Sequence, residues 1–135
     1  MRILVIDGMG GGLGKSIIES IKTPLQDCEI FAVGTNALAT TAMLKAGASR
    51  GATGENAILY NCKQADFIIG AIGIILADAM LGEISPSISQ AVSSSTAHKI
   101  LIPVQGCPVT IVGGSDKPLA QMIAEIPDTV RRLCK

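Results

Sequence analysis

The clearest candidates for a binding site are the glycines at positions 8, 10, 11, 12 and 14, which follow a short apolar stretch. Residues 3–6 are mostly β-branched and are typical of a strand buried on both faces. Ile17, Ile18 and Ile21 then recur at helical spacing. The glycines therefore join a strand to a helix N-terminus, where free backbone N–H groups and the helix dipole favour an anion. We expect a phosphate group to bind there.

The spacing of these glycines separates three nucleotide-loop templates. G-x-G-x-x-G fails because Leu13 stands where the third glycine is needed, and the P-loop template fails because Met9 occupies its first glycine position. Gly8, Gly12 and Gly14 fit G-x-x-x-G-x-G, which resembles the nucleotide loop of short-chain dehydrogenases and related Rossmann proteins. The alternative is a turn that packs the helix against the strand and binds no ligand.

The expected ligand contacts come from this loop and from the ends of two further strands. Asn36 follows the strand at residues 29–34 and either caps the next helix or points its amide at the ligand. The segment 65–73 resembles the fourth strand of Rossmann domains, whose glycine-bearing end lines the nucleotide cleft. The predicted binding residues are Asp7, Gly8, Gly10, Gly11, Gly12, Leu13, Gly14, Lys15, Asn36, Gly70 and Gly73.

The end of the second strand argues against an ordinary NAD or NADP site. Dinucleotide-binding proteins usually carry an acidic residue there for the ribose hydroxyls, or a basic residue for a 2′-phosphate. Here the strand ends in Gly34-Thr35-Asn36, which offers neither charge. A nucleotide or a dinucleotide such as NAD(P) stays a candidate ligand because of the glycine-rich loop. Its ribose would lack the charged residue that usually contacts it.

Three residues are weak candidates for catalysis: Glu55, Glu83 and Cys107. Glu83 lies in a turn after a strand that faces the cleft, where it is either a ligand contact or an ordinary turn residue. Cys107 has no basic neighbour in the sequence to lower its pKa. Tyr60 and Lys63 are three residues apart, whereas the catalytic pair of short-chain dehydrogenases is four apart.

The acidic residues near the glycine loop would repel a phosphate, and the sequence predicts no metal site. Several acids near a phosphate loop would repel the anion unless Mg²⁺ or Lys15 compensates, or unless the ligand is instead a polar or cationic small molecule. His98 is the single histidine, so it cannot build a multi-histidine site. The four cysteines are scattered without a C-x-x-C pair, which indicates reduced thiols.

The elements that must position these residues alternate between strand and helix. This alternation predicts an α/β fold of three layers, a Rossmann-like, doubly wound and mostly parallel sheet in the order 3-2-1-4-5. The short link at residues 105–108 predicts an antiparallel edge strand at 109–112. The strands are expected at residues 3–6, 29–34, 48–53, 65–73 and 100–104. The helices are expected from Ser16, over 37–46, from Glu55, over 74–81, over 87–94 and over 118–126, with a polar turn at the C-terminus.

Composition narrows the partners. The length suits one domain, residues 1–135. A formal net charge of zero, with no Trp, one Tyr and two Phe, argues against a nucleic-acid partner. The longest apolar stretch, residues 67–81, contains Asp78 and is too short to cross a membrane. Without a signal-peptide pattern at residue 1, we expect a cytoplasmic protein. Its 48% hydrophobic content suggests a homo-oligomer.

Longer segments point to one family. The segments IDGMGGGLGKSI, GTNALATTAMLKAGA, GATGENAI, IIGAIGII, MLGEISP and KILIPVQGC resemble a family of small uncharacterised bacterial proteins, domain of unknown function 3842. The resemblance implies a bacterial protein and carries no activity or catalytic residue with it.

Two functions follow from the residues. The first is a regulatory or binding module for a nucleotide, a dinucleotide or a phosphorylated metabolite at the glycine-rich loop. The second is a small nucleotide-dependent enzyme, an oxidoreductase or a transferase, whose site is completed by oligomerisation.

Overall fold

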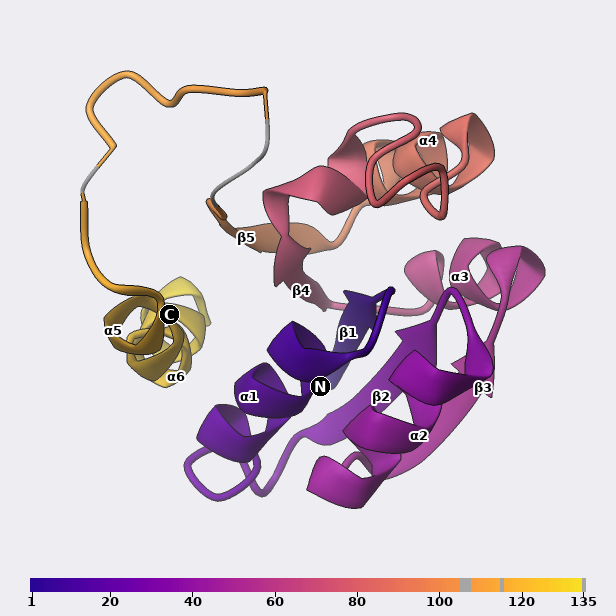
Figure 1. Cartoon of the computed structure of the whole chain (residues 1–135). Helices are drawn as coiled ribbons and strands as arrows, with labels where there is room; N and C mark the ends of the chain where they lie inside the picture. The colour runs from indigo at the N-terminus through magenta and orange to yellow at the C-terminus, as the bar shows by residue number, and fades with distance from the viewer. Residues whose placement is uncertain (105–107, 115, 135) are drawn as a thin grey trace.

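The computed structural model describes residues 1–104, 108–114 and 116–134. Strands and helices alternate through most of the chain (Figure 1). The strands are β1 (Arg2–Asp7), β2 (Glu29–Gly34), β3 (Arg50–Thr53), β4 (Phe67–Ala71) and β5 (His98–Ile102). The helices are α1 (Gly12–Ile21), α2 (Ala37–Ala46), α3 (Glu55–Cys62), the 3-10 helix η1 (Ile72–Ile75), α4 (Pro86–Ser94), α5 (Leu119–Ala124) and α6 (Ile126–Leu133).

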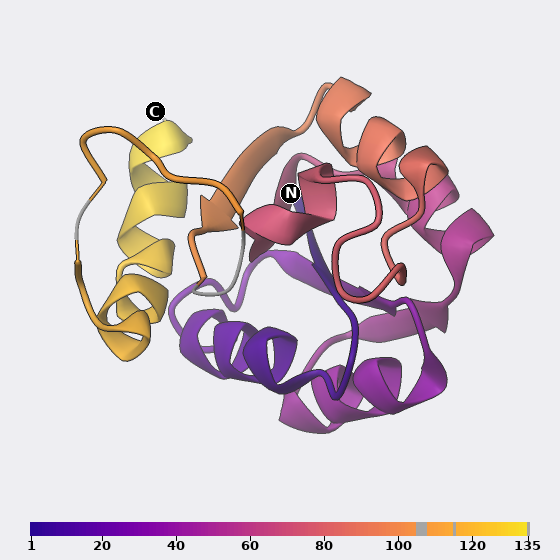
Figure 2. The same cartoon turned by 45° about the horizontal axis from the view of Figure 1, so that its top comes forward.

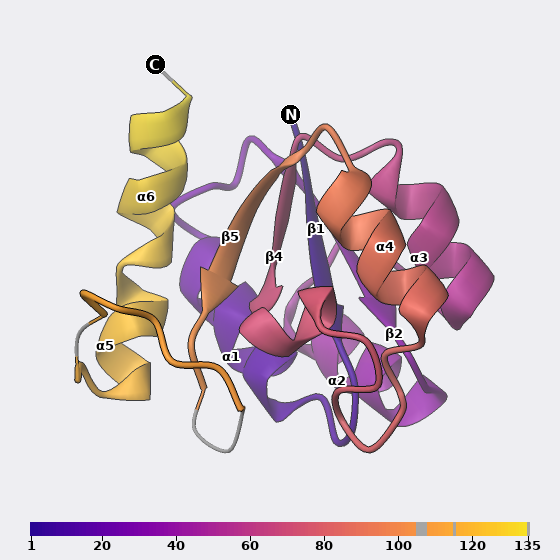
Figure 3. The same cartoon turned by 90° about the horizontal axis from the view of Figure 1, so that it is seen from above.

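The five strands form one sheet in the order β3-β2-β1-β4-β5, which confirms the predicted order. Every pair of neighbours is parallel. β1 lies at the centre, where Ile3 pairs with Ile30 of β2 on one side and with Phe67 of β4 on the other. Figure 3 looks down on β5, β4 and β1 side by side. The carboxyl ends of all five strands therefore meet at one edge of the sheet.

The predicted antiparallel edge strand at residues 109–112 is wrong. These residues form no strand, and β5 is the edge of the sheet. Their side chains have no face to bury, since Ile111 is 50% exposed and Val112 is 98% exposed. Residues 108–114 have no helix or strand, and the next elements after β5 are α5 and α6, drawn in yellow in Figure 2.

Each face of the sheet has its own core. One face packs against α1, α2, α5 and α6, and its buried residues include Ile17, Ile69 and Val130. The other face packs against α3, η1 and α4, and its buried residues include Leu4, Ile58 and Val92. Because β1 and β4 are covered on both faces, their sequences are continuous apolar runs rather than alternating ones. The three layers match the predicted fold class.

Several element boundaries differ from the predictions. α1 begins at Gly12 rather than Ser16, and the C-terminal turn is the helix α6, anchored by buried Val130. The helix predicted at 74–81 is replaced by η1 and an irregular segment, residues 76–84, which we call the cap loop. Met80 and Leu81 have positive φ angles of 57° and 56°, which no right-handed helix can accommodate. Among the described residues, no helix has the length and apolar character needed to cross a bilayer.

Candidate functional site

The candidate site lies at the carboxyl end of the central strand, where Asp7 begins the turn into α1. The Asp7 carboxylate is buried and accepts hydrogen bonds from the N–H of Gly8 at 2.8 Å and of Gly14 at 2.6 Å. Gly14 belongs to the first turn of α1, so Asp7 ties the strand end to the helix start. Burial raises the pKa of this carboxyl group above its usual 3.8, and the two N–H donors oppose that rise.

Some residues of the glycine loop, which we define as residues 8–14, are glycines because the fold leaves no room for a side chain. Gly11 has a φ of +77°, and a Cβ there would come within 2.7 Å of the Ala39 Cα. A Cβ on Gly14 would lie 2.5 Å from the Met43 Sδ. Gly8 is similarly crowded by the cap loop and Thr35. Gly11 and Gly14 let α2 pack closely against the start of α1, and Gly8 lets the cap loop approach the end of β1, as the packing interpretation expects.

Gly10 and Gly12 are different, because nothing in the fold requires them to be glycine. Neither has a positive φ angle, both are exposed, and a Cβ at either position would meet no atom within 4 Å. The N–H groups of Gly12 and Leu13, at the start of α1, have no hydrogen-bond acceptor among the residues that the structure describes. The glycine loop therefore presents free donors and bare backbone to open space.

A cavity of about 220 Å³ lies over this open part of the loop. Its lining combines residues of the glycine loop with apolar residues from the end of β4, the cap loop and the segment after β5. The lining residues are Asp7, Gly8, Met9, Gly10, Gly11, Gly12, Leu13, Ala71, Met80 and Val104. The cavity thus combines backbone hydrogen-bond donors with apolar side chains.

Asn36 caps a helix, which is one of its two predicted roles, and its amide donates to protein acceptors rather than into open space. Its Oδ1 accepts the N–H of Ala39 at 2.9 Å, which caps α2. Its Nδ2 donates to the carbonyl of Met9 at 3.0 Å and to Oε1 of Glu83 at 2.9 Å. The amide therefore links the end of β2 to the glycine loop and to the cap loop.

The structure brings Glu83 to the carboxyl ends of β1 and β2, although it is distant from both in sequence. Its Oε1 accepts hydrogen bonds from the N–H of Met9, from the Thr35 hydroxyl and from the Asn36 amide. The Thr35 hydroxyl is the strongest of three hydrogen bonds that hold the pKa of Glu83 below its usual 4.5. Thr35 was missed as a site residue, since a threonine before a helix cap gives no signal of its own.

The remaining predicted residues lie around this cluster rather than in it. Lys15 is exposed in the first turn of α1, and Glu55 is exposed and hydrogen-bonded to Ser85. Gly70 and Gly73 are buried by packing against η1 and the cap loop, and Ala71 between them reaches the cavity. Cys107 lies outside the described residues. Among the residues described, no three His, Cys, Asp or Glu side chains form a metal-binding group.

The stability of the folded protein should depend on pH through Glu83. A carboxyl group with a lowered folded-state pKa stabilises the fold above its unfolded pKa, here 4.5, and that contribution is lost as the pH falls through the folded value. Wild type should therefore lose stability relative to Glu83→Gln as the pH drops below 4.5. The raised pKa of Asp7 acts in the opposite direction, lowering stability as the pH rises from 3.8, and does so in both proteins.

Thermal unfolding of both proteins across the acidic range measures this effect. Their difference removes most of the contribution of Asp7, of which only the part due to repulsion by Glu83, the last of its four causes, changes with the substitution. A difference in unfolding free energy that stays constant with pH would contradict the assigned hydrogen bonds of Glu83.

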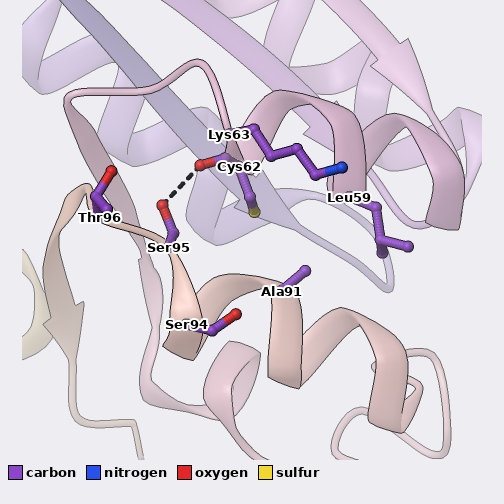
Figure 4. Close-up of a pocket in the computed structure, with 7 residues that line it drawn as sticks. All are labelled: Leu59, Cys62, Lys63, Ala91, Ser94, Ser95 and Thr96. Carbon is purple, nitrogen blue, oxygen red and sulfur yellow. Dashed lines mark hydrogen bonds between the residues drawn. The ribbon is translucent and has the colours of Figure 1, made fainter.

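A second cavity, of about 420 Å³, lies between the C-terminal ends of α3 and α4 (Figure 4). The Ser95 hydroxyl donates to the Cys62 carbonyl at 2.6 Å beside it. Burial raises the pKa of the Cys62 thiol to about 11, so the thiol is protonated and unreactive at neutral pH. Helix C-termini carry negative partial charge, which disfavours an anion here despite Lys63. The larger cavity is therefore the weaker candidate for a phosphorylated ligand.

Comparisons with known proteins place the chain in a family. A solved structure described as a universal stress protein in complex with cAMP is similar to it, with 18% sequence identity and a TM-score of 0.42. The match covers 74% of this chain and 95% of that chain. No curated protein matches the chain significantly. A family model matches residues 2–135, and the protein therefore belongs to the family described as Domain of unknown function (DUF3842).

Proposed function

We propose that this protein is a binding module for a nucleotide or another phosphorylated metabolite, held by its phosphate at the glycine loop. The observation that carries the proposal is the contrast among the glycines. Gly11 and Gly14 are needed for packing, whereas Gly10 and Gly12 face open space at an ordinary φ. Bare backbone in that position allows a ligand to approach the free N–H groups of Gly12 and Leu13.

The lining of the cavity supports a ligand larger than inorganic phosphate. Met9, Leu13, Ala71, Met80 and Val104 give an apolar wall next to the backbone donors. Ligand sites typically combine such walls with a few placed polar groups, in volumes of roughly 300–1,000 Å³. At about 220 Å³ this cavity suits the phosphate end and its neighbouring atoms. The rest of the ligand would extend over the loop surface.

The carboxylates do not exclude an anion here. Both oxygens of Asp7 are occupied by backbone N–H donors, and burial raises the pKa of this carboxyl group. Glu83, with its lowered pKa, is ionised at neutral pH and is a poor proton donor. This favours binding over a role for Glu83 as a general acid.

Gly12→Asp is expected to abolish phosphate binding while leaving the fold at least as stable. A carboxylate in the first turn of α1 complements the helix dipole by about 0.3–1 kcal/mol, and a side chain at this position meets no neighbour. The same carboxylate would repel a phosphate at the N–H groups of Gly12 and Leu13. Isothermal titration with pyrophosphate, ADP and NAD, together with thermal unfolding of each protein, measures both effects.

Gly12→Ala is the matched control, since it adds the Cβ without the charge. It should weaken binding less than Gly12→Asp and raise stability by about 0.4–1 kcal/mol. Binding that survives Gly12→Asp unchanged, or wild type that binds none of the three probes, would overturn the proposal.

A further inference from the structure

We propose that Glu83 supplies the ribose contact that the end of β2 lacks, so that the ligand is a ribonucleotide with free 2′- and 3′-hydroxyl groups. This inference rests on the proposed function and names the ligand class for that site. The sequence ends β2 in Gly34-Thr35-Asn36, without the acidic residue that parallel nucleotide-binding sheets usually carry there. The fold delivers a carboxylate to the same place from the cap loop.

The position of the carboxylate is fixed by contacts from both sides of the crevice. Met9 of the glycine loop donates its N–H at 3.0 Å, and Asn36 donates its amide at 2.9 Å. Thr35, which directly follows β2, donates its hydroxyl. Glu83 therefore spans the gap between the turn after β1, where a phosphate would sit, and the end of β2, where a ribose would follow.

One oxygen of the carboxylate is left for a ligand. All three donors reach Oε1, and Oε2 has no hydrogen-bond partner among the residues that the structure describes. The Glu83 side chain is only partly buried, so that oxygen is accessible. An ionised carboxylate is a pure acceptor with about four lone-pair sites, which suits the two O–H donors of a vicinal diol. The same charge would repel a 2′-phosphate.

The cap loop is built to hold this residue in place. Ile74, which precedes it, and Ile84, its last residue, are fully buried, and backbone hydrogen bonds such as Asp78 N–H to the Ile84 carbonyl at 2.7 Å close the loop on itself. Met80 from the same loop lines the cavity beside Gly8. A single segment thus provides Met80 to the lining of the cavity and holds the carboxylate of Glu83 against the N–H of Met9.

The test compares four probes by isothermal titration: pyrophosphate, ADP, 2′-deoxy-ADP and ADP carrying a 2′-phosphate. Wild type should bind ADP at least about 10-fold more tightly than 2′-deoxy-ADP, because a hydrogen bond to a charged group is lost. It should bind the 2′-phosphorylated compound more weakly still. In Glu83→Gln the preference for ADP over 2′-deoxy-ADP should fall below about 3-fold, with pyrophosphate affinity unchanged.

Glu55→Gln is the matched control, because it removes an exposed carboxylate that is bonded to Ser85 rather than to the glycine loop. It should keep the wild-type preference. Wild type that binds pyrophosphate and binds ADP and 2′-deoxy-ADP equally would overturn this inference and leave the proposed function standing. Tighter binding of every probe by Glu83→Gln would overturn it too, because it would show that the carboxylate of Glu83 opposes the binding of the ligand. Failure of all four probes would overturn the proposed function itself.

Discussion

Gly11→Ala is expected to lower the free energy of unfolding by about 3 kcal/mol. Two costs add at this position. The φ of +77° is left-handed, which costs a residue with a Cβ about 1–2 kcal/mol. The new Cβ would also lie 2.7 Å from the Ala39 Cα, a backbone atom that cannot move without shifting α2. Overpacking of this kind costs typically about 1–3 kcal/mol.

Gly10→Ala is the control, because its Cβ meets no atom within 4 Å and its φ is not positive. Chemical denaturation of both variants measures the contrast. If Gly10→Ala destabilised the protein as strongly as Gly11→Ala, the division of the glycine loop into packing and open positions would be wrong, and the proposed phosphate site would lose its main support.

Asp7→Ala is expected to lower the free energy of unfolding by about 2–4 kcal/mol. Removing the carboxylate leaves the N–H groups of Gly8 and Gly14 buried without their acceptor, at about 1–3 kcal/mol each. A partial gain offsets this loss, because the raised pKa of Asp7 shows that burial of its charge is unfavourable. The start of α1 should also lose its attachment to β1.

Asp7→Asn separates the loss of hydrogen bonds from the relief of the buried charge. Its amide is neutral, and it can accept one N–H but presents a donor to the other. It should fall between wild type and Asp7→Ala. Hydrogen exchange of the Gly8 and Gly14 amides gives a local readout, and both should exchange faster in Asp7→Ala. A variant with unchanged stability and unchanged protection of these amides would contradict the role assigned to Asp7.

The sequence predicted the strand order and the position of the glycine loop because both depend on local pattern. Buried parallel strands are continuous apolar runs, as in β1 and β4, and the alternation of strands with helices then leaves few topologies. The carboxyl ends of the strands follow from that order, and with them the place of Asp7 and Asn36. The homo-oligomer and the cytoplasmic location stay predictions.

The rest depends on contacts between distant segments. Glu83 was a weak candidate from sequence because nothing near it in the chain indicates Met9, Thr35 or Asn36 as partners. Residues 74–81 were predicted as a helix because they are largely apolar, whereas Met80 and Leu81 take left-handed backbone angles. The antiparallel strand at 109–112 was inferred from a short link, which does not reveal that the chain departs to form α5 and α6.

The same distinction applies to the glycines. Their spacing indicates a loop, but it does not show which glycines are needed for packing. The surroundings of each residue show that the fold has no room for a side chain at Gly11 and has room for one at Gly12. Templates based on spacing alone treat the two as equivalent.

The central place of β1 has a consequence for the growing chain. β1 is the first strand made, yet one of its two neighbours, β4, begins only at Phe67, near the middle of the sequence. Pairing between such distant parallel strands is slow, because the entropy of closing a long loop is lost before any contact compensates. Until β4 is synthesised, an apolar strand edge of β1 has no partner, and such edges promote association. A chain that ends before β4 is therefore expected to associate more readily than one that contains it.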